Sequence, residues 1–453
     1  MYFNSENELI IKAKEARGKT FKEIDKFNRL SKKGATGALG NIIEESFFGY
    51  EVNSKAEADF SNLGVELKVT PFKQNKNKTL SAKERLVLNI INYMDEVHND
   101  FWSSSFWKKN EKLLLMFYEW KPEIDRGDYK IIETILFTFP EEDLEIIKKD
   151  WEFIVNKIRA GEAHNLSEGD TQYLGACTKG ANKNSLRAQP YSDELAMQRA
   201  YSLKQSYMTT LVRQVISNEK LVQFASADEL KEKTLEQLLK ERFEPYTGMT
   251  MMEMANKLNI KINPKNRAVV ANLISALLGV KGTKLDNIAE FAKANIQFKT
   301  VRLKQNGKPK ESMSFVNIDF NEILEETWED SFIRNYFLET QILFVVFQFD
   351  EEDILRFKGI KLWHMPLQTI ENEVFNYWSE IRKVLKDGVV LTKTSKGVEN
   401  NFPKSNFNGV LHVRPKGADA NDKVQLPDGQ WITKQCYWLN ASYIAEIVSS
   451  LEV

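Results

Sequence analysis

The feature that most constrains this chain is an internal repeat, because a sequence pattern that occurs twice predicts two similar folding units. Residues 17–24 return as residues 247–254, an offset of 230 positions, and residues 60–68 return as residues 291–299 at an offset of 231. Three shorter pairs keep the same order along the chain: Phe48-Gly49 with Leu278-Gly279, residues 179–181 with 416–418, and residues 201–207 with 437–443. The sequence therefore predicts a tandem duplication of about 200 residues per copy.

Domain boundaries follow from the repeat. We predict a first domain at residues 1–216, a linker at residues 217–242 and a second domain at residues 243–453. Leucines at helical spacing in the linker predict an amphipathic helix, and Glu244-Pro245 would end it.

Helix and strand signals alternate within the first copy. Apolar residues at helical spacing predict helices at residues 38–48 and 143–159, and short apolar runs predict strands at residues 65–69 and 113–118. The predicted fold class is α/β: two tandem domains, each with a mixed sheet flanked by helices.

Composition excludes several classes of protein. No apolar run approaches the roughly 20 residues that span a bilayer, and the first residues lack the pattern of a signal peptide, so we expect a cytoplasmic protein without a membrane partner. The two cysteines, Cys177 and Cys436, indicate neither a disulfide framework nor a zinc site. The net charge of −1 alone favours an ordinary enzyme over a DNA-binding protein, so any DNA contact requires a polarised surface.

Carboxylates and a lysine concentrate in residues 45–68. Asp59 and Glu66 offer the oxygen ligands that Mg²⁺ prefers. Glu66 and Lys68 are two apart on a predicted strand, so Glu66 can bind the metal while Lys68 contacts the attacking water or the phosphate. Glu45, from the preceding helix, would add a further ligand. The alternative is a solvated strand face, a frequent arrangement in a chain with 64 acidic and 63 basic residues.

Residues 40–49, 54–60 and 63–68 closely resemble the MutH family of GATC-specific endonucleases, which belongs to the group with the PD-(D/E)xK nuclease fold. The resemblance includes flanking residues, such as Ser54-Lys55, that metal chemistry does not require. By position it implies a catalytic set of Glu45, Asp59, Glu66, Lys68 and Lys109, with Asp59 and Glu66 as ligands of Mg²⁺.

The resemblance also implies a base-reading loop at residues 173–182, in which Lys179 would donate to guanine. The predicted DNA contacts of the first copy are Lys179, Lys183, Arg187, Tyr201 and Ser202. The three basic residues recur four apart, which predicts either a phosphate-facing helical stripe or a solvated helix face. Tyr201 stands where the family has an aromatic DNA contact, or it is a core residue.

The second copy has lost most of the cutting chemistry. The positions that correspond to Glu45, Asp59, Glu66 and Lys68 form a degenerate set: Ser275, Glu290, Gln297 and Lys299. Leu338 corresponds to Lys109 when the strands at residues 113–118 and 342–347 are aligned. Serine and glutamine cannot replace two anionic ligands, so we predict a second copy without catalytic activity.

Residues 412–417 of the second copy nevertheless keep Arg414 and Lys416, and both side chains can pair with guanine. These residues predict a DNA-binding domain that acts as an effector. The alternative is a degenerate domain kept only to support folding.

The resemblance implies a Mg²⁺-dependent type II restriction endonuclease that recognises 5′-GATC-3′ in double-stranded DNA and cuts 5′ of the G, leaving four-base overhangs. With one active site per chain, we expect a free monomer that forms a dimer on DNA or loops DNA between two sites. A companion methyltransferase would protect the host DNA. Two alternatives remain: a MutH-like mismatch-repair enzyme that nicks one strand, and a catalytically silent GATC-binding protein.

Overall fold

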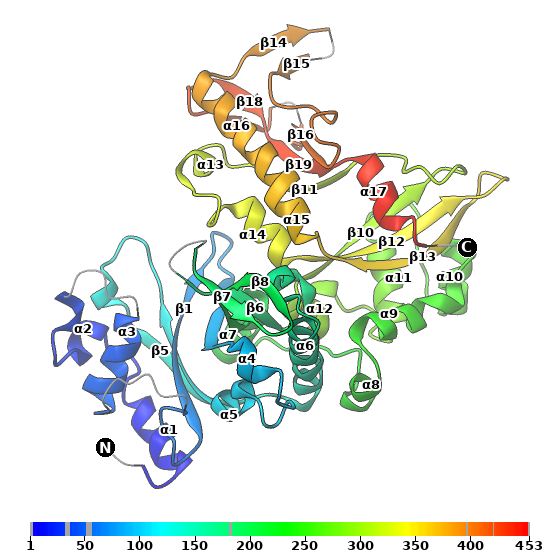
Figure 1. Cartoon of the computed structure of the whole chain (residues 1–453). Helices are drawn as coiled ribbons and strands as arrows, with labels where there is room; N and C mark the ends of the chain where they lie inside the picture. The colour runs from blue at the N-terminus through cyan, green and yellow to red at the C-terminus, as the bar shows by residue number, and fades with distance from the viewer. Residues whose placement is uncertain are drawn as a thin grey trace. The chain divides into compact units, whose positions relative to one another are not determined.

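The computed structural model describes residues 3–31, 37–50, 57–180, 184–395, 397–419 and 421–451. The chain divides into two compact units (Figure 1). The first unit consists of Met1–Leu235 with Asp286–Asn295, and the second of Glu236–Leu285 with Ile296–Val453.

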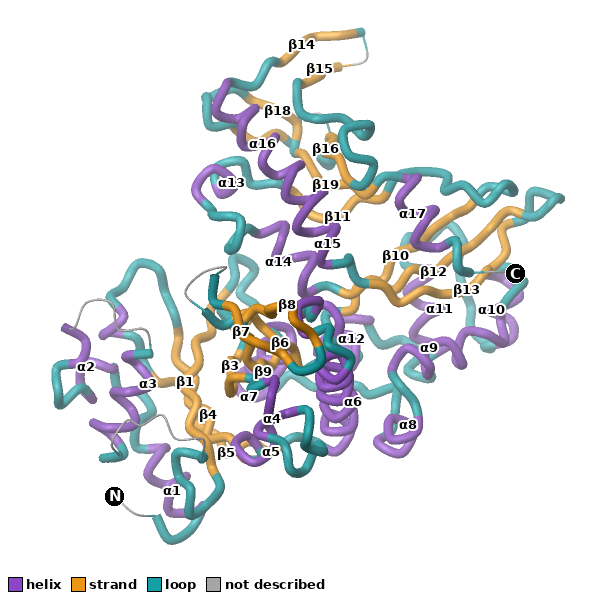
Figure 2. Tube along the Cα trace, viewed as in Figure 1, coloured by secondary structure: helices purple, strands orange, loops and turns teal. Residues whose placement is uncertain are grey.

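Helices and strands alternate along the first unit (Figure 2). In chain order they are α1 (Glu6–Lys14), α2 (Phe21–Ile24), α3 (Ala38–Ile42), the π-helical turn η2 (Ile43–Phe47), β1 (Val65–Gln74), β2 (Leu80–Ala82), β3 (Leu86–Ile90), α4 (Tyr93–Glu96), α5 (Ser105–Asn110), β4 (Lys112–Glu119), β5 (Ile131–Thr138), α6 (Glu141–Arg159), β6 (Leu174–Thr178), β7 (Leu186–Gln189), β8 (Ser192–Met197), β9 (Arg199–Leu203), α7 (Gln205–Ser217), α8 (Ala227–Glu232) and, from the later segment, α12 (Ala289–Lys293).

The second unit follows the same alternation. Its elements are α9 (Leu235–Phe243), which begins at the boundary, α10 (Met251–Lys257), α11 (Val269–Leu277), β10 (Ile296–Leu303), β11 (Met313–Asn317), α13 (Glu322–Glu325), α14 (Phe332–Glu339), β12 (Gln341–Phe349), β13 (Leu355–Trp363), α15 (Leu367–Thr369), α16 (Phe375–Asp387), β14 (Leu391–Thr394), β15 (Gly397–Asn400), β16 (Leu411–Pro415), β17 (Lys423–Gln425), β18 (Trp431–Thr433), β19 (Gln435–Leu439) and α17 (Ala441–Val448).

Each unit contains a mixed sheet with one parallel strand pair, which confirms the predicted α/β class. The described strands of the first unit form the order β2-β1-β4-β5, in which β1 and β4 are parallel and the other neighbours antiparallel. Strand β4 is central and buried over Leu113–Tyr118, which explains its continuous apolar sequence. A second sheet has the order β3-β9-β6.

The two copies share the register of their parallel strands. In the first unit Glu66 lies opposite Leu113, and in the second unit Gln297 lies opposite Ile342. The second unit repeats the sheet as β10-β12-β13 and the smaller sheet as β11-β19-β16. The strand alignment predicted from the repeat is therefore confirmed.

The most similar segments of the repeat form one local motif in both units. Gly18 and Gly248 have φ angles of 80° and 81°, in the left-handed region that favours glycine. Two residues later, the side chains of Thr20 and Thr250 accept the backbone N–H of Glu23 and Glu253. Each glutamate carboxylate in turn accepts the backbone N–H of its threonine, so both helices begin with a capping box. This motif fixes the entry into α2 and α10 and explains why its residues recur.

Two predicted helices differ in detail from the structure. Residues 38–48 form α3 and then the π-helical turn η2, rather than one regular helix. The linker stretch forms the short helices α8 and α9, separated at Lys233, which has an extended backbone. The predicted helix at residues 143–159 is α6, which starts slightly earlier.

The segment Asp286–Asn295 comes from the second copy but packs in the first unit. The ammonium of Lys293 lies 2.7 Å from both carboxylate oxygens of Asp143, and both side chains are buried. Glu290 accepts the backbone N–H groups of Phe224 at 3.1 Å and Ala225 at 3.0 Å. These contacts hold α12 in place.

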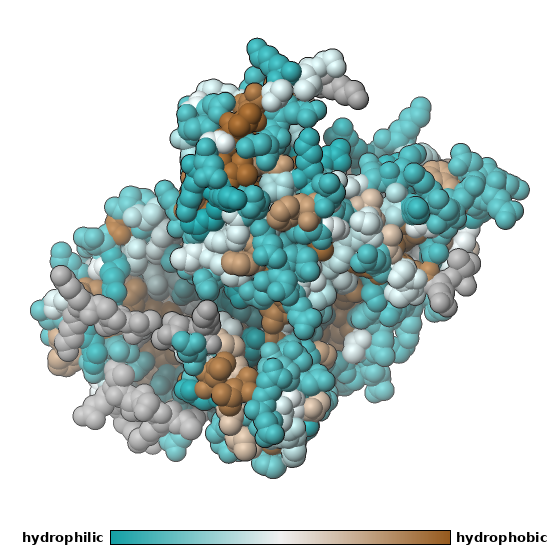
Figure 3. Space-filling model, turned by 45° about the horizontal axis from the view of Figure 1, so that its top comes forward, coloured by the Kyte–Doolittle hydropathy of each residue, from teal (hydrophilic) through white to brown (hydrophobic). Residues whose placement is uncertain are grey.

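Hydrophilic residues predominate on the face shown in Figure 3, and the hydrophobic residues there form separate patches. Within the described ranges, no helix combines the length and the apolar character needed to cross a membrane.

Candidate active site

Strand β1 carries the centre of the candidate site. Glu66 and Lys68 leave the same face of this strand, and Glu66 is 3% exposed. The Lys68 ammonium lies 2.9 Å from Glu66 Oε1. Lys109, from α5, brings its Nζ to 3.6 Å from the same oxygen. The structure thus brings together three residues that lie up to 43 positions apart in the sequence (109 − 66).

Asp59 lies directly beside this group. Its backbone N–H donates to Glu66 Oε2 at 3.3 Å, and its carboxylate accepts the backbone N–H of Leu67 at 2.9 Å. Burial, and then the negative charge of Glu66, raise the pKa of Asp59 to about 6. The turn that returns the chain to β1 contains Gly64, with a φ of 65° that a side chain would strain.

The structure corrects the prediction for Glu45. This side chain pairs with the Arg29 guanidinium, whose Nε donates to Oε2 at 2.5 Å. The charges of Asp59, Glu66 and Lys68 instead act on its neighbour, Glu44. Burial raises the pKa of Glu44 to about 7, and the negative charges of Asp59 and Glu66 contribute to this shift.

The π-helical turn η2 is the reason for this change of residue. A π-helical turn holds one residue more than an α-helical turn. The backbone N–H of Tyr50 donates to the Glu44 carbonyl, whereas the corresponding N–H of Val280 donates to the Ser275 carbonyl. By hydrogen bonding, Ser275 therefore matches Glu44, although an offset of 230 matches it to Glu45. The adjacent pair of glutamates was the only sequence signal for the alternative.

The donor set fits a divalent metal ion chemically. Burial, and then the charge of neighbouring carboxylates, raises the pKa values of Glu44 and Asp59. Such crowding favours a hard cation that takes carboxylate oxygens. Within the described ranges, no three His, Cys, Asp or Glu side chains converge as closely as in a preformed metal site. Glu66 is held by the two lysines instead.

The predicted basic stripe of the first unit is wrong for the residues that the structure describes. Lys179 follows β6 and is exposed, while Arg187 lies on β7, which pairs with β8. Lys183 lies outside the described residues. Residues 186–189 form a strand because their backbone groups pair with those of β8, so the spacing of four does not place Arg187 on a helix face.

Tyr201 and Ser202 are core residues rather than DNA contacts. Both lie on β9, the central strand of its sheet, and they are 0% and 1% exposed. The Tyr201 hydroxyl donates to Glu96 Oε1 at 3.2 Å, and Trp151 Nε1 donates to the same oxygen. The prediction that they touch DNA is therefore wrong.

We expect Tyr201→Phe to lower the free energy of unfolding by about 1 kcal/mol, because it removes a buried hydrogen bond and keeps the ring. The affinity for DNA should not change. Urea unfolding and a DNA-binding isotherm measure the two quantities. Unchanged stability together with weaker DNA binding would contradict the assignment of Tyr201 to the core.

Members of the degenerate set have separate hydrogen-bond partners in the structure. Gln297 accepts a hydrogen bond from the Tyr336 hydroxyl, and Leu338 is buried in α14. Ser275 is buried in α11, where its hydroxyl donates to a carbonyl of the same helix. Glu290, predicted as the counterpart of Asp59, lies in the first unit, where its carboxylate accepts backbone N–H groups.

Arg414 and Lys416 lie at the exposed end of β16. The Arg414 guanidinium lies 4.6 Å from the centre of the Trp438 ring. The backbone N–H of Lys416 donates to the Lys434 carbonyl at 2.8 Å. In the first unit, the backbone N–H of Lys179 donates to the Gln198 carbonyl at 2.7 Å. The same strand-end geometry therefore presents a lysine in each unit.

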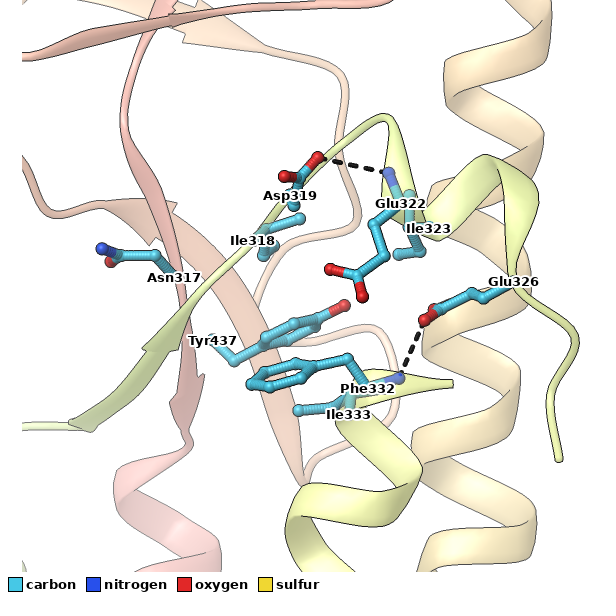
Figure 4. A pocket seen from close by; sticks show the side chains of 9 residues that line it. All are labelled: Asn317, Ile318, Asp319, Glu322, Ile323, Glu326, Phe332, Ile333 and Tyr437. Atoms are coloured by element: carbon cyan, nitrogen blue, oxygen red, sulfur yellow. Dashed lines mark hydrogen bonds between the residues drawn. The ribbon is translucent and has the colours of Figure 1, made fainter. Parts of the chain in front are cut away.

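A separate pocket of the second unit has an acidic lining (Figure 4). It encloses about 90 Å³ and includes Asp319, Glu322 and Glu326. The Asp319 carboxylate accepts the backbone N–H of Glu322, and Glu326 accepts that of Phe332. Its negative charge is unsuited to a DNA phosphate.

Comparison with known proteins identifies the family to which this chain belongs. The family described as "DNA mismatch repair enzyme MutH" matches residues 48–150 and again residues 282–374. The type II restriction enzyme Sau3AI of Staphylococcus aureus is 38% identical over 97% of this chain and 97% of its own length. The DNA mismatch repair proteins MutH of Shewanella sp. (strain MR-7) and Shewanella amazonensis are 27% and 30% identical, over 40% and 39% of this chain and 79% of each relative. Because the family matches in both halves and a restriction enzyme aligns along nearly the whole chain, this protein belongs to the MutH family, among the type II restriction enzymes similar to Sau3AI.

Proposed function

We propose that this protein recognises 5′-GATC-3′ in double-stranded DNA and, with Mg²⁺, hydrolyses the phosphodiester bond 5′ of the G. The observation that carries the proposal is the convergence of Lys68 and Lys109 on one oxygen of Glu66, with Asp59 beside the other oxygen. Two ammonium groups next to crowded carboxylates suit a reaction that adds negative charge to a phosphate.

Each side chain of the site has a distinct role in this proposal. Asp59 and Glu66 would hold the metal ion, with Glu44 as a further carboxylate. Bound Mg²⁺ supplies a Lewis acid and lowers the pKa of a coordinated water. Lys68 orients the attacking water or the phosphate from the face of β1. Lys109 stabilises the charge that develops on the phosphate oxygens.

Base recognition in the first unit is assigned to the end of β6. Lys179 is exposed immediately after this strand, and a lysine there can donate to the O6 and N7 atoms of guanine. Because the proposal gives each chain one cutting site, two chains meeting on DNA, or two successive nicks, would cut both strands. A companion methyltransferase would protect the host DNA.

The second unit is proposed to bind DNA as an effector through Arg414 and Lys416. We expect Lys416→Ala to weaken DNA binding and slow cleavage about tenfold, the loss typical of one base contact. The dependence of cleavage on Mg²⁺ concentration should stay unchanged, because Lys416 is not part of the proposed metal site. Single-turnover cleavage at several Mg²⁺ concentrations measures both effects.

Lys386→Ala is the matched control for this variant, since Lys386 is an exposed lysine of the same unit, on α16. Equal cleavage by both variants would count against a DNA contact at Lys416. A comparison of plasmids with one and several GATC sites tests the effector role: equal rates on both would argue against it.

Incubation of unmethylated plasmid with the full chain, in Mg²⁺ or in EDTA, tests the proposed function. Fragments in Mg²⁺ alone are expected. Nicked circles that require hemimethylated DNA would favour a repair-type nicking enzyme. A retarded but intact plasmid would favour a silent binding protein.

A further inference from the structure

The second unit keeps one lysine of the cutting site without the carboxylate that neutralises it. In the first unit, Lys68 lies 2.9 Å from Glu66 Oε1. The matching positions on β10 hold Lys299 and Gln297, as the shared strand register shows. Gln297 is neutral, and its oxygen accepts a hydrogen bond from Tyr336 at 2.9 Å. Lys299 therefore lacks, at the matching position, the carboxylate that pairs with Lys68 in the first unit.

Two ammonium groups meet at Ser314. Lys299 Nζ donates to the Ser314 carbonyl at 2.9 Å, and Lys416 Nζ donates to the hydroxyl of the same residue. Burial, and then the positive charge of Lys416, lower the pKa of Lys299, while the Cys436 thiol acts in the opposite direction. In the described part of the chain, no carboxylate is among the groups that shift this pKa. An anion between the two lysines would remove their repulsion.

A cavity of about 260 Å³ adjoins Lys299 and Ser314. Its volume is several times the ~30 Å³ that one water molecule occupies in the liquid, so a phosphate group with bound water would fit. Glu311 also lines the cavity, but its carboxylate is ion-paired with Arg302 at 2.5 Å. Trp438, which contacts Arg414, forms another part of the lining.

We propose that this cavity, the Lys299 pocket, binds a backbone phosphate of duplex DNA without a metal ion. The proposal rests on the DNA-binding role proposed above for the second unit and gives that role a second contact. Lys416 would then link the pocket to the exposed end of β16, where Arg414 lies. A lysine pair needs no cation to hold a phosphate, because it supplies the positive charge itself.

Fluorescence anisotropy of a labelled GATC duplex with the full chain in EDTA tests the pocket. We expect Lys299→Gln to weaken binding about tenfold, as for a charged hydrogen bond that is lost. The slope of log K against log salt should fall by about 0.9, the value for one phosphate contact. Lys299→Arg should restore the slope. Lys308→Gln, an exposed lysine of the same unit, is the matched control.

Two further variants separate the possible failures. Lys416→Gln removes the second ammonium from an exposed position, and its effect should be smaller in a Lys299→Gln background than alone, because both lysines hold the same phosphate. Arg414→Gln tests DNA binding by the second unit while both ammonium groups stay in place. Loss with Arg414→Gln but with neither lysine variant would overturn the pocket alone. No loss with any of the three would overturn the DNA-binding role as well. Lysine variants that weaken binding only after a divalent metal ion is added back would overturn metal-free binding.

Discussion

Replacing Lys68 with alanine is expected to slow cleavage of a GATC duplex by about 10²–10³-fold, the cost of removing one donor that stabilises transition-state charge. The Lys68 ammonium lies 2.9 Å from Glu66 and is largely shielded from solvent, at 17% exposure of its side chain. Its charge therefore acts in a site where water screens it weakly. Single-turnover cleavage in saturating Mg²⁺ measures the chemical step.

Lys22→Ala is the matched control, because Lys22 is an exposed lysine on α2 of the same unit. The control should cleave at the wild-type rate. Thermal unfolding and DNA binding should show that Lys68→Ala is folded and still binds the duplex. Wild-type cleavage by Lys68→Ala would remove Lys68 from the catalytic set.

Glu44→Gln is expected to slow cleavage by about 10- to 100-fold, the range for groups that directly support a metal site. A neutral amide cannot supply the negative charge that Glu44 brings beside Asp59 and Glu66. Glu45→Gln should cleave near the wild-type rate, since its side chain pairs with Arg29. Both variants make the same chemical change, but the two side chains have different neighbours. Cleavage rates of the two variants, measured across a Mg²⁺ titration, can therefore be compared directly.

The opposite order of these two rates would contradict the structural correction. If Glu45→Gln were the slower variant, the π-helical turn would not place Glu44 in the site. Equal rates for both variants would indicate that neither glutamate supports the metal. Urea unfolding of each variant checks that a loss of stability does not explain a slow rate.

The parts of this protein that could be predicted from the sequence are those that depend on local spacing. The repeat predicted two α/β copies, and the strand alignment that places Gln297 opposite Ile342 is confirmed. Glu66 and Lys68 share a face because side chains two apart on a strand leave the same side. The MutH resemblance is confirmed by the family match in both halves.

The parts that could not be predicted depend on backbone detail or on packing. One extra residue in η2 moves Glu44 into the place expected for Glu45, and adjacent glutamates give no local sign of it. Arg187 lies on a strand because β7 pairs with β8, which the spacing of basic residues does not reveal. Tyr201 is buried against Phe106 and Glu96, which lie far from it in the sequence, so local spacing does not reveal its burial.

Packing also explains why the neighbours of Glu290 differ from those of Asp59. The repeat aligns it with Asp59, but it lies in a segment that packs in the first unit and binds backbone N–H groups there. The alignment of the repeat shows which positions correspond in sequence. Packing determines which residues each side chain contacts.

Sequencing of the DNA ends after digestion of an unmethylated plasmid by the full chain in Mg²⁺ tests the central claim most directly. We predict that both strands are cut 5′ of the G in every GATC site, with four-base 5′ overhangs and no product in EDTA. Ends at other sequences, cuts in only one strand, or intact DNA would contradict a GATC-specific restriction endonuclease.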